Sequence, residues 1–190
     1  DSNSKNFIDR YFGTHIAGGN NMSGEGPYIK WDKNSGFYFM YETYGGLITT
    51  GGYNMRLFRS KTLAGPYVDP AGNWAQNSGA DCYKYGVKLI GNYQFKNQIG
   101  YRSAGHNSAL ITDDGKYYLV FHQRFSDSSK GEYHEVRVRQ QFLNEDNWLV
   151  TAVYEYKSEK IAIYDESEVI GDYELVNHGN AEKDGNMIRT

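Results

Sequence analysis

The chain has 190 residues and a formal net charge of −3, with 23% charged and 39% hydrophobic residues. This length suits one domain of ordinary size, and the composition excludes both a disordered charged tail and a membrane-embedded chain. No basic excess is present of the kind that attracts nucleic acid or anionic lipid, so neither is expected as a partner and a neutral ligand fits better. The single cysteine, Cys82, excludes an internal disulfide framework.

Aromatic residues and glycine dominate the composition. The chain contains 18 Tyr, 9 Phe, 3 Trp and 22 Gly, against only 3 Pro. Tyrosine and phenylalanine favour pleated, half-buried surfaces, whereas glycine interrupts them at turns. The composition therefore predicts an all-β fold.

A repeated unit is the clearest feature of the sequence. Two parts of the chain each read as strand, tight turn, strand and then a third strand with period-2 alternation. The offset between the copies is 81 residues when Glu25 is aligned with His106 and 80 residues when Tyr53 is aligned with Tyr133. Two offsets that agree within one residue indicate a duplication. The matching segments are residues 24–29 and 105–111, residues 37–41 and 117–121, and residues 51–59 and 131–139.

A fourth strand is predicted to complete each copy, near residues 65–68 in the first and near residues 147–150 in the second. A four-stranded antiparallel meander is the blade of a β-propeller. Residues 73–100 are rich in Gly, Asn and Tyr without a helical period, so we expect a long loop there, of the kind that often carries binding sites. Trp74, in this loop, is the best candidate for an aromatic platform under a sugar ring.

Two blades cannot close a propeller, which takes about four to eight. We therefore expect a partial propeller over residues 1–155. Residues 156–190 would form a linker and the truncated beginning of a C-terminal β-domain, in which residues 169–176 read as new strand material. The missing blades would come from an N-terminal propeller segment on another chain or from a second copy of this one; otherwise the repeat is not a propeller.

Glu25 and His106 stand at the heads of the two first strands. In a propeller the innermost strands line the central channel, so both side chains are expected to face one axial pocket. A carboxylic acid between two glycines, which let a substrate approach the backbone, is the form that a general acid takes in glycoside hydrolysis. From these residues alone, Glu25 could equally be an exposed turn carboxylate, and His106 a hydrogen-bonding residue instead of a metal ligand.

Six short motifs extend these observations. They occupy residues 25–29, 44–47, 51–56, 65–69, 105–108 and 134–138. In order and spacing they resemble the endo-α-1,5-L-arabinanases of glycoside hydrolase family 43, and the resemblance covers about residues 13–155. Each motif alone is weak, but jointly they are specific. Residues 171–174 and 177–179 resemble the start of the extra C-terminal β-domain that larger secreted arabinanases carry.

The resemblance implies a five-bladed β-propeller, of which this chain supplies about the last two blades, and hydrolysis of arabinan or arabino-oligosaccharides with inversion. It makes Glu25 the general acid and His106 the ligand of a single metal ion in the channel, expected to be calcium. Calcium prefers oxygen ligands, so waters and neighbouring residues would complete its shell. Tyr44, Gly45 and Gly46 would line the arabinose cleft, and the protein would be secreted or otherwise extracytoplasmic.

The chain departs from the family pattern in its catalytic base. An inverting hydrolase needs a second carboxylate about 6.5–9.5 Å from the acid, and the resemblance places it on the first blade, upstream of Glu25. We therefore expect this chain to be inactive alone and to become an enzyme with an N-terminal partner segment. The alternatives are a non-catalytic carbohydrate-binding propeller fragment, or an exo-acting arabinofuranosidase or xylosidase of the same family.

Overall fold

Two four-stranded antiparallel sheets form the computed structural model, which describes residues 5, 12–18, 24–48, 52–77, 84–158, 162–173 and 175. Cys82 lies outside these residues. In the first sheet the strands are β1 (Gly24–Asp32), β2 (Phe37–Tyr44), β3 (Asn54–Ser60) and β4 (Val87–Ile90). In the second they are β5 (Tyr101–Ile111), β6 (Tyr117–Phe125), β7 (His134–Leu143) and β8 (Leu149–Thr151). The all-β prediction and the two meanders are confirmed.

The β1–β2 hairpin shows how the sequence sets a strand boundary. The carboxylate of Asp32, buried at the end of β1, accepts hydrogen bonds from the backbone N–H of Asn34 and of Ser35, at 3.2 and 3.0 Å. Gly36 then takes a positive φ of 66°, which glycine adopts without a steric cost. The polar run between the two apolar strands therefore closes a tight turn.

The fourth strand of the first sheet is not where the sequence predicted it. Of residues 65–68, only Val68 pairs with the sheet, in isolated bridges to Arg59 and to Trp74. The fourth strand is β4 instead, and it pairs with residues 55–57 of β3. The expected long loop over residues 73–100 accordingly contains β4 and the short 3₁₀ helix η1 (Ala75–Asn77). In the second sheet β8 confirms the prediction.

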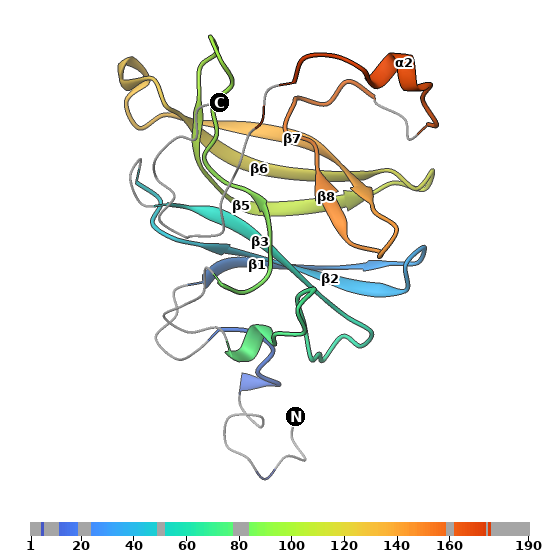
Figure 1. Cartoon of the computed structure of the whole chain (residues 1–190). Coiled ribbons are helices and arrows are strands. Elements are labelled where there is room, and N and C mark those ends of the chain that lie inside the picture. The colour runs from blue at the N-terminus through green and yellow to red at the C-terminus, as the bar shows by residue number, and fades with distance from the viewer. Residues whose placement is uncertain are drawn as a thin grey trace.

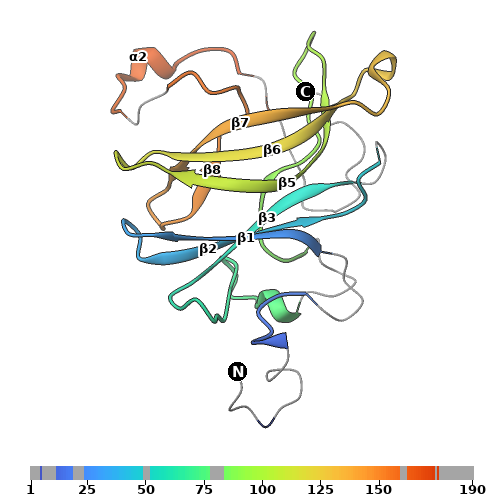
Figure 2. The ribbon, with the colours of Figure 1, turned by 180° about the vertical axis from the view of Figure 1, so that it is seen from behind.

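The two sheets stack face to face, with β1 and β5 side by side where they meet (Figures 1 and 2). One core cluster fills the space between them, and a smaller one lies on the other face of the first sheet. The larger cluster draws Phe39, Tyr41, Met55 and Leu57 from the first sheet, and Ala109, Leu119, Phe121, Trp148 and Leu149 from the second part of the chain.

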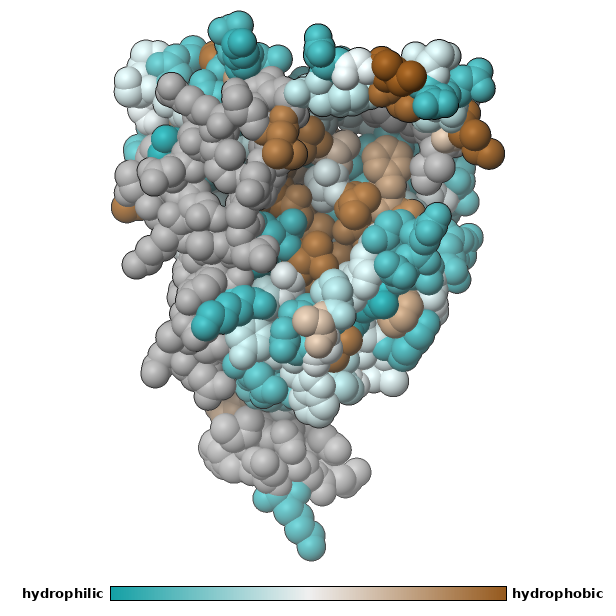
Figure 3. Space-filling model, viewed as in Figure 1, coloured by the Kyte–Doolittle hydropathy of each residue, from teal (hydrophilic) through white to brown (hydrophobic). Residues whose placement is uncertain are grey.

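Polar bonds also join the sheets through their buried interface. Tyr41 donates its hydroxyl hydrogen to Gln141 Oε1 at 3.0 Å, and Tyr117 donates to Asp32 Oδ1 at 3.1 Å. On the face seen in Figure 3, apolar side chains gather in a hollow where the two sheets meet. The two buried hydrogen bonds thus help to hold the two sheets, and with them their first strands, in a fixed relative position.

The end of the described chain tests only part of the prediction of new strand material over residues 169–176, because residues 174 and 176–190 lie outside the described residues. Residues Glu166–Val169 form the short helix α2, and no described residue after Thr151 belongs to a strand. The backbone N–H of Asp165 donates to the Glu168 carboxylate at 3.0 Å, which caps this turn.

Within the described residues, no helix is long and apolar enough to cross a membrane.

Glu42 on β2 is a buried carboxyl, only 6% exposed, opposite Arg56 of β3. Burial raises its pKa from 4.5 to about 7. Such a group binds its proton more tightly in the folded than in the unfolded chain. Its contribution to stability is therefore full below about pH 4.5 and is lost as the pH rises through about 7.

Replacing Glu42 by Gln is expected to stabilise the protein more at about pH 8 than at about pH 5, by a difference of up to about 3 kcal/mol, because Gln removes the cost of ionising a buried carboxyl. Thermal unfolding of both proteins at the two pH values measures this difference. Glu145→Gln, at an exposed position, is the control and should show no pH-dependent change. A Glu42→Gln effect that is equal at both pH values would contradict the assignment.

Candidate functional site

The first strands of both sheets break their register at matching points. In β1 the pairing jumps from Glu25↔Thr43 to Tyr28↔Tyr41, and in β5 it jumps at Gly105↔His122 before resuming at Ser108↔Val120. Such bulges redirect side chains and are common beside active sites. Both first strands therefore carry a local kink where the sequence placed its candidate residues.

The kinks correct the alignment of the two copies by one residue. Gly26 has φ 58° and His106 has φ 52°, so His106 is the equivalent of Gly26, with an offset of 80 residues. The second strands, which begin at Phe37 and Tyr117, have the same offset. Glu25 consequently corresponds to Gly105, and the expectation that Glu25 and His106 occupy the same position of the repeat was wrong.

The structure nevertheless brings Glu25 and His106 together. A Cβ added at Gly26 would lie 3.2 Å from Cγ of His106, so the imidazole packs directly against the residue that follows Glu25. The backbone N–H of His106 donates to Thr43 Oγ1 at 2.9 Å, and Thr43 is the register partner of Glu25. This bond supports His106 in a left-handed conformation that costs a non-glycine residue about 1–3 kcal/mol.

The Glu25 carboxyl is exposed to solvent, while its hydrogen-bond partner is buried. The hydroxyl of Tyr53, a residue only 1% exposed, donates to Glu25 Oε1. An accessible carboxyl with one oxygen bonded from behind can exchange a proton with a ligand through the other oxygen.

Two further histidines extend the site, and the sequence did not single them out. The His122 ring stacks on Tyr53 at 5.8 Å and lies 6.5 Å from the His106 ring. His122 Nδ1 is 2.7 Å from Nδ1 of His134, so one of these nitrogens donates and the other accepts. Burial, followed by the neighbouring His134 and His106, lowers the pKa of His122 to about 4, and burial likewise lowers the pKa of His134. The pair is thus held with at least one neutral ring.

The donors around His106 bear on the expected calcium ion. Among the residues that the structure describes, no three His, Cys, Asp or Glu side chains gather closely enough to hold a metal ion. His106 offers one imidazole, whereas calcium takes six to eight oxygen ligands. The described part of the chain therefore does not form a calcium site by itself.

No family model matches the chain, but proteins of similar sequence and of similar structure are known. The extracellular endo-α-(1→5)-L-arabinanase of Thermotoga petrophila is 41% identical over 180 residues, and extracellular endo-α-(1→5)-L-arabinanase 2 of Bacillus subtilis is 41% identical over 182 residues. Each match covers 88% of this chain, which spans only 38% of each relative's length. The crystal structure of the glycoside hydrolase family 43 YxiA protein of Bacillus licheniformis superposes with a TM-score of 0.86 at 42% identity, over 92% of this chain and 41% of that one.

Over most of its length the chain is similar to members of glycoside hydrolase family 43. Its two sheets are two blades of the five-bladed propeller of that family. The strands β1 and β5, which carry Glu25 and His106, are the first strands of the two sheets and contact each other.

The other predicted residues of the chain are distributed around the site. Tyr44 is fully buried in the smaller core cluster, so its ring would support a cleft from below without touching a sugar. Gly45 and Gly46 follow at the end of β2 and are partly or fully exposed. A Cβ at Gly45, where φ is 86°, would lie 2.5 Å from the carbonyl oxygen of Gly52, so only glycine fits there. Trp74 is 46% exposed and directly precedes η1, which Figures 1 and 2 show on the side of the first sheet that faces away from the second.

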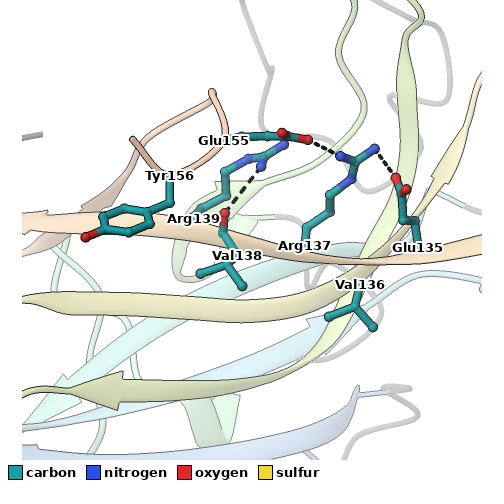
Figure 4. Close-up of a pocket in the computed structure, with 7 residues that line it drawn as sticks. All are labelled: Glu135, Val136, Arg137, Val138, Arg139, Glu155 and Tyr156. Carbon is teal, nitrogen blue, oxygen red and sulfur yellow. Dashed lines mark hydrogen bonds and ion pairs between the residues drawn. The ribbon is translucent and has the colours of Figure 1, made fainter. Parts of the chain in front are cut away.

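A pocket of about 350 Å³ lies along β7, and its arginines already bind neighbouring groups of the protein (Figure 4). Arg137 forms ion pairs with Glu135 and Glu155, and its guanidinium lies 4.5 Å from the centre of the Tyr101 ring. Arg139 donates to the Tyr93 hydroxyl at 3.2 Å. The pocket is therefore a structural ion-pair network, and it contains neither Glu25 nor His106.

Proposed function

We propose that this chain is the acid-bearing part of a glycosidase that hydrolyses the α-1,5-L-arabinofuranosidic bonds of arabinan or arabino-oligosaccharides with inversion. The observation that carries the proposal is the exposed Glu25 carboxyl, which is bonded through Oε1 to a buried tyrosine and lies beside His106, on the first strands of the two sheets. The two bacterial relatives are named as arabinanases of the same α-1,5 bond.

In this proposal Glu25 is the general acid. Its proton passes to the glycosidic oxygen as the bond from that oxygen to the anomeric carbon breaks. A water molecule attacks the anomeric carbon from the opposite face and gives its proton to a base carboxylate about 6.5–9.5 Å from Glu25. We assign that base to the missing blades, which an N-terminal propeller segment on another chain or a second copy of this chain would supply.

The remaining site residues follow from the same proposal. Gly45, Gly46 and Trp74 would contact the arabinose units, and Tyr44 would support them from the core. His106 would supply one ligand to a calcium ion, with waters and other blades supplying the oxygen ligands that calcium requires. The bound ion would supply positive charge to the channel.

We also propose the organisation and location of the protein. Residues 1–155 would be the catalytic partial propeller, and residues 156–190 a linker and the start of a C-terminal domain. The protein would act outside the cell, like the two relatives that are named extracellular.

The chain alone is expected to release no product from linear arabinan, because the base carboxylate is on other blades. The same chain joined to its N-terminal blades is expected to hydrolyse arabinan, as measured by the release of reducing ends. Turnover by the chain alone would refute the assignment of the base. Oligosaccharide binding without hydrolysis by the complete protein would favour the carbohydrate-binding alternative, and release of only the shortest products would indicate exo action.

A further inference from the structure

Tyr53 occupies an unusual place between the two blades. It directly precedes β3 of the first sheet, and its side chain is almost fully buried at 1% exposure. Its hydroxyl bonds to Glu25 of β1, in the same sheet. Its ring, however, contacts residues of the second sheet.

Two residues of the second sheet fix the Tyr53 ring. The His122 ring of β6 stacks on it with centroids 5.8 Å apart and an angle of 22° between the planes. The Gly105 backbone of β5 lies directly against it, because a Cβ at Gly105 would be 2.1 Å from Tyr53 Cε1. Because the Tyr53 ring is packed against both β5 and β6, it has little freedom to rotate. The packing of the blades therefore sets the direction of its hydroxyl.

The protonation of Tyr53 is equally fixed. Burial, with the bond to Glu25 as a second cause, raises the pKa of the Tyr53 hydroxyl well above its ordinary value. Tyr53 therefore keeps its proton and acts towards Glu25 as a donor only. Glu25 Oε1 is occupied by this bond, and Glu25 Oε2 is the oxygen left to carry a transferable proton.

We propose that Tyr53 is a positioning residue for the general acid: its hydroxyl holds Glu25 Oε1, so that Oε2 presents its proton to the departing glycosidic oxygen. The inference rests on the proposed function of Glu25. During the step the proton leaves Oε2 as the glycosidic bond breaks, and the negative charge that develops on the carboxylate is stabilised by the unchanged Tyr53 hydroxyl. Tyr53 does not touch the substrate and transfers no proton.

Tyr53→Phe in the complete protein tests this role, because it removes only the hydroxyl. We expect kcat on a linear arabino-oligosaccharide to fall about 10- to 100-fold with KM nearly unchanged, as for other displaced acids. On a nitrophenyl glycoside of the same oligosaccharide the loss should be about 3-fold or less, since nitrophenolate departs without needing a proton. Tyr117→Phe, which removes a buried hydroxyl bonded to Asp32 at the other end of β1, is the control and should leave both activities unchanged.

Two results would overturn the inference: an equal loss on both substrates, which indicates a structural role, or no loss on either. Glu25→Gln, measured in parallel, separates this failure from that of the proposed function. In one outcome, Glu25→Gln loses hydrolysis of the oligosaccharide and retains hydrolysis of the nitrophenyl glycoside, while Tyr53→Phe does not show this difference. In that case Glu25 remains the general acid, and only the role of Tyr53 is wrong. If the unmodified protein hydrolyses neither substrate, the proposed function is wrong and the role of Tyr53 is excluded with it.

Discussion

Glu25→Gln is expected to lower the hydrolysis of linear arabinan by the complete protein about 10²- to 10⁴-fold, the usual contribution of a general acid. Gln has the shape of Glu and can still accept the Tyr53 hydrogen bond through its amide oxygen, but it has no transferable proton. Initial rates of reducing-end release measure the loss. Oligosaccharide affinity, measured by calorimetry, should change little, because the exposed side chain keeps its size and position.

The control for this prediction is Glu145→Gln, an exposed carboxyl on the β7–β8 connection, which should retain full activity. Retained hydrolysis in Glu25→Gln would show that the acid lies elsewhere. Loss of binding together with hydrolysis would show that Glu25 holds the substrate instead of protonating it.

Gly105→Ala is expected to have the largest effect on the fold of the site. The new methyl carbon would lie 2.1 Å from Tyr53 Cε1 and 2.5 Å from Thr43 Cγ2. Both neighbours are buried between the blades, so relief requires a shift of the sheets or of the Tyr53 ring. We expect the free energy of unfolding to fall by about 1–3 kcal/mol or more, as for other overpacked cores, and hydrolysis to fall with it because Tyr53 leaves Glu25.

Chemical denaturation of the variant and the unmodified protein measures this change in stability. Gly171→Ala is the matched control, because a Cβ at Gly171 meets nothing within 4 Å and its φ is not positive. A Gly105→Ala protein as stable as the control would mean that the blades are less closely packed at this point than the structure indicates.

The sequence predicted the second blade better than the first. Alternating strands and tight turns are local signals, and β5 to β8 follow each other with short connections. In the first blade the fourth strand comes only at Val87, long after β3 ends at Ser60. A four-residue strand after such an insertion has no local pattern that distinguishes it from a loop. Residues 65–68, Gly-Pro-Tyr-Val, have the pattern of a strand start although they do not form the fourth strand.

The one-residue error in aligning the copies has a physical cause. Matching Glu25 with His106 pairs two chemically prominent residues, but hairpin register pairs Glu25 with Thr43 and Gly105 with His122. The same register brings His122 beside the site, so counting outward from the turn at residues 113–115 would have found it. Contacts of Tyr53 across the blades could not be predicted, since they depend on how two sheets pack.

The helix α2 was missed for another reason. Asp165 and Glu168 have the spacing of a capping box, and Asp165 N–H does bond to the Glu168 carboxylate. The β-branched and aromatic residues that follow, such as Val169, Ile170 and Tyr173, favour a strand and mask this start signal.

The matching kinks of β1 and β5 have a broader consequence. The same backbone conformation occurs twice, 80 residues apart. Glu25-Gly26 adopt it in one copy and Gly105-His106 in the other. The same backbone conformation thus carries a carboxyl in one copy and an imidazole in the other. The two dipeptides are not interchangeable, because a glutamate at position 105 would place its Cβ 2.1 Å from Tyr53 Cε1. Each copy therefore accepts only the residues that suit the packing of its own blade.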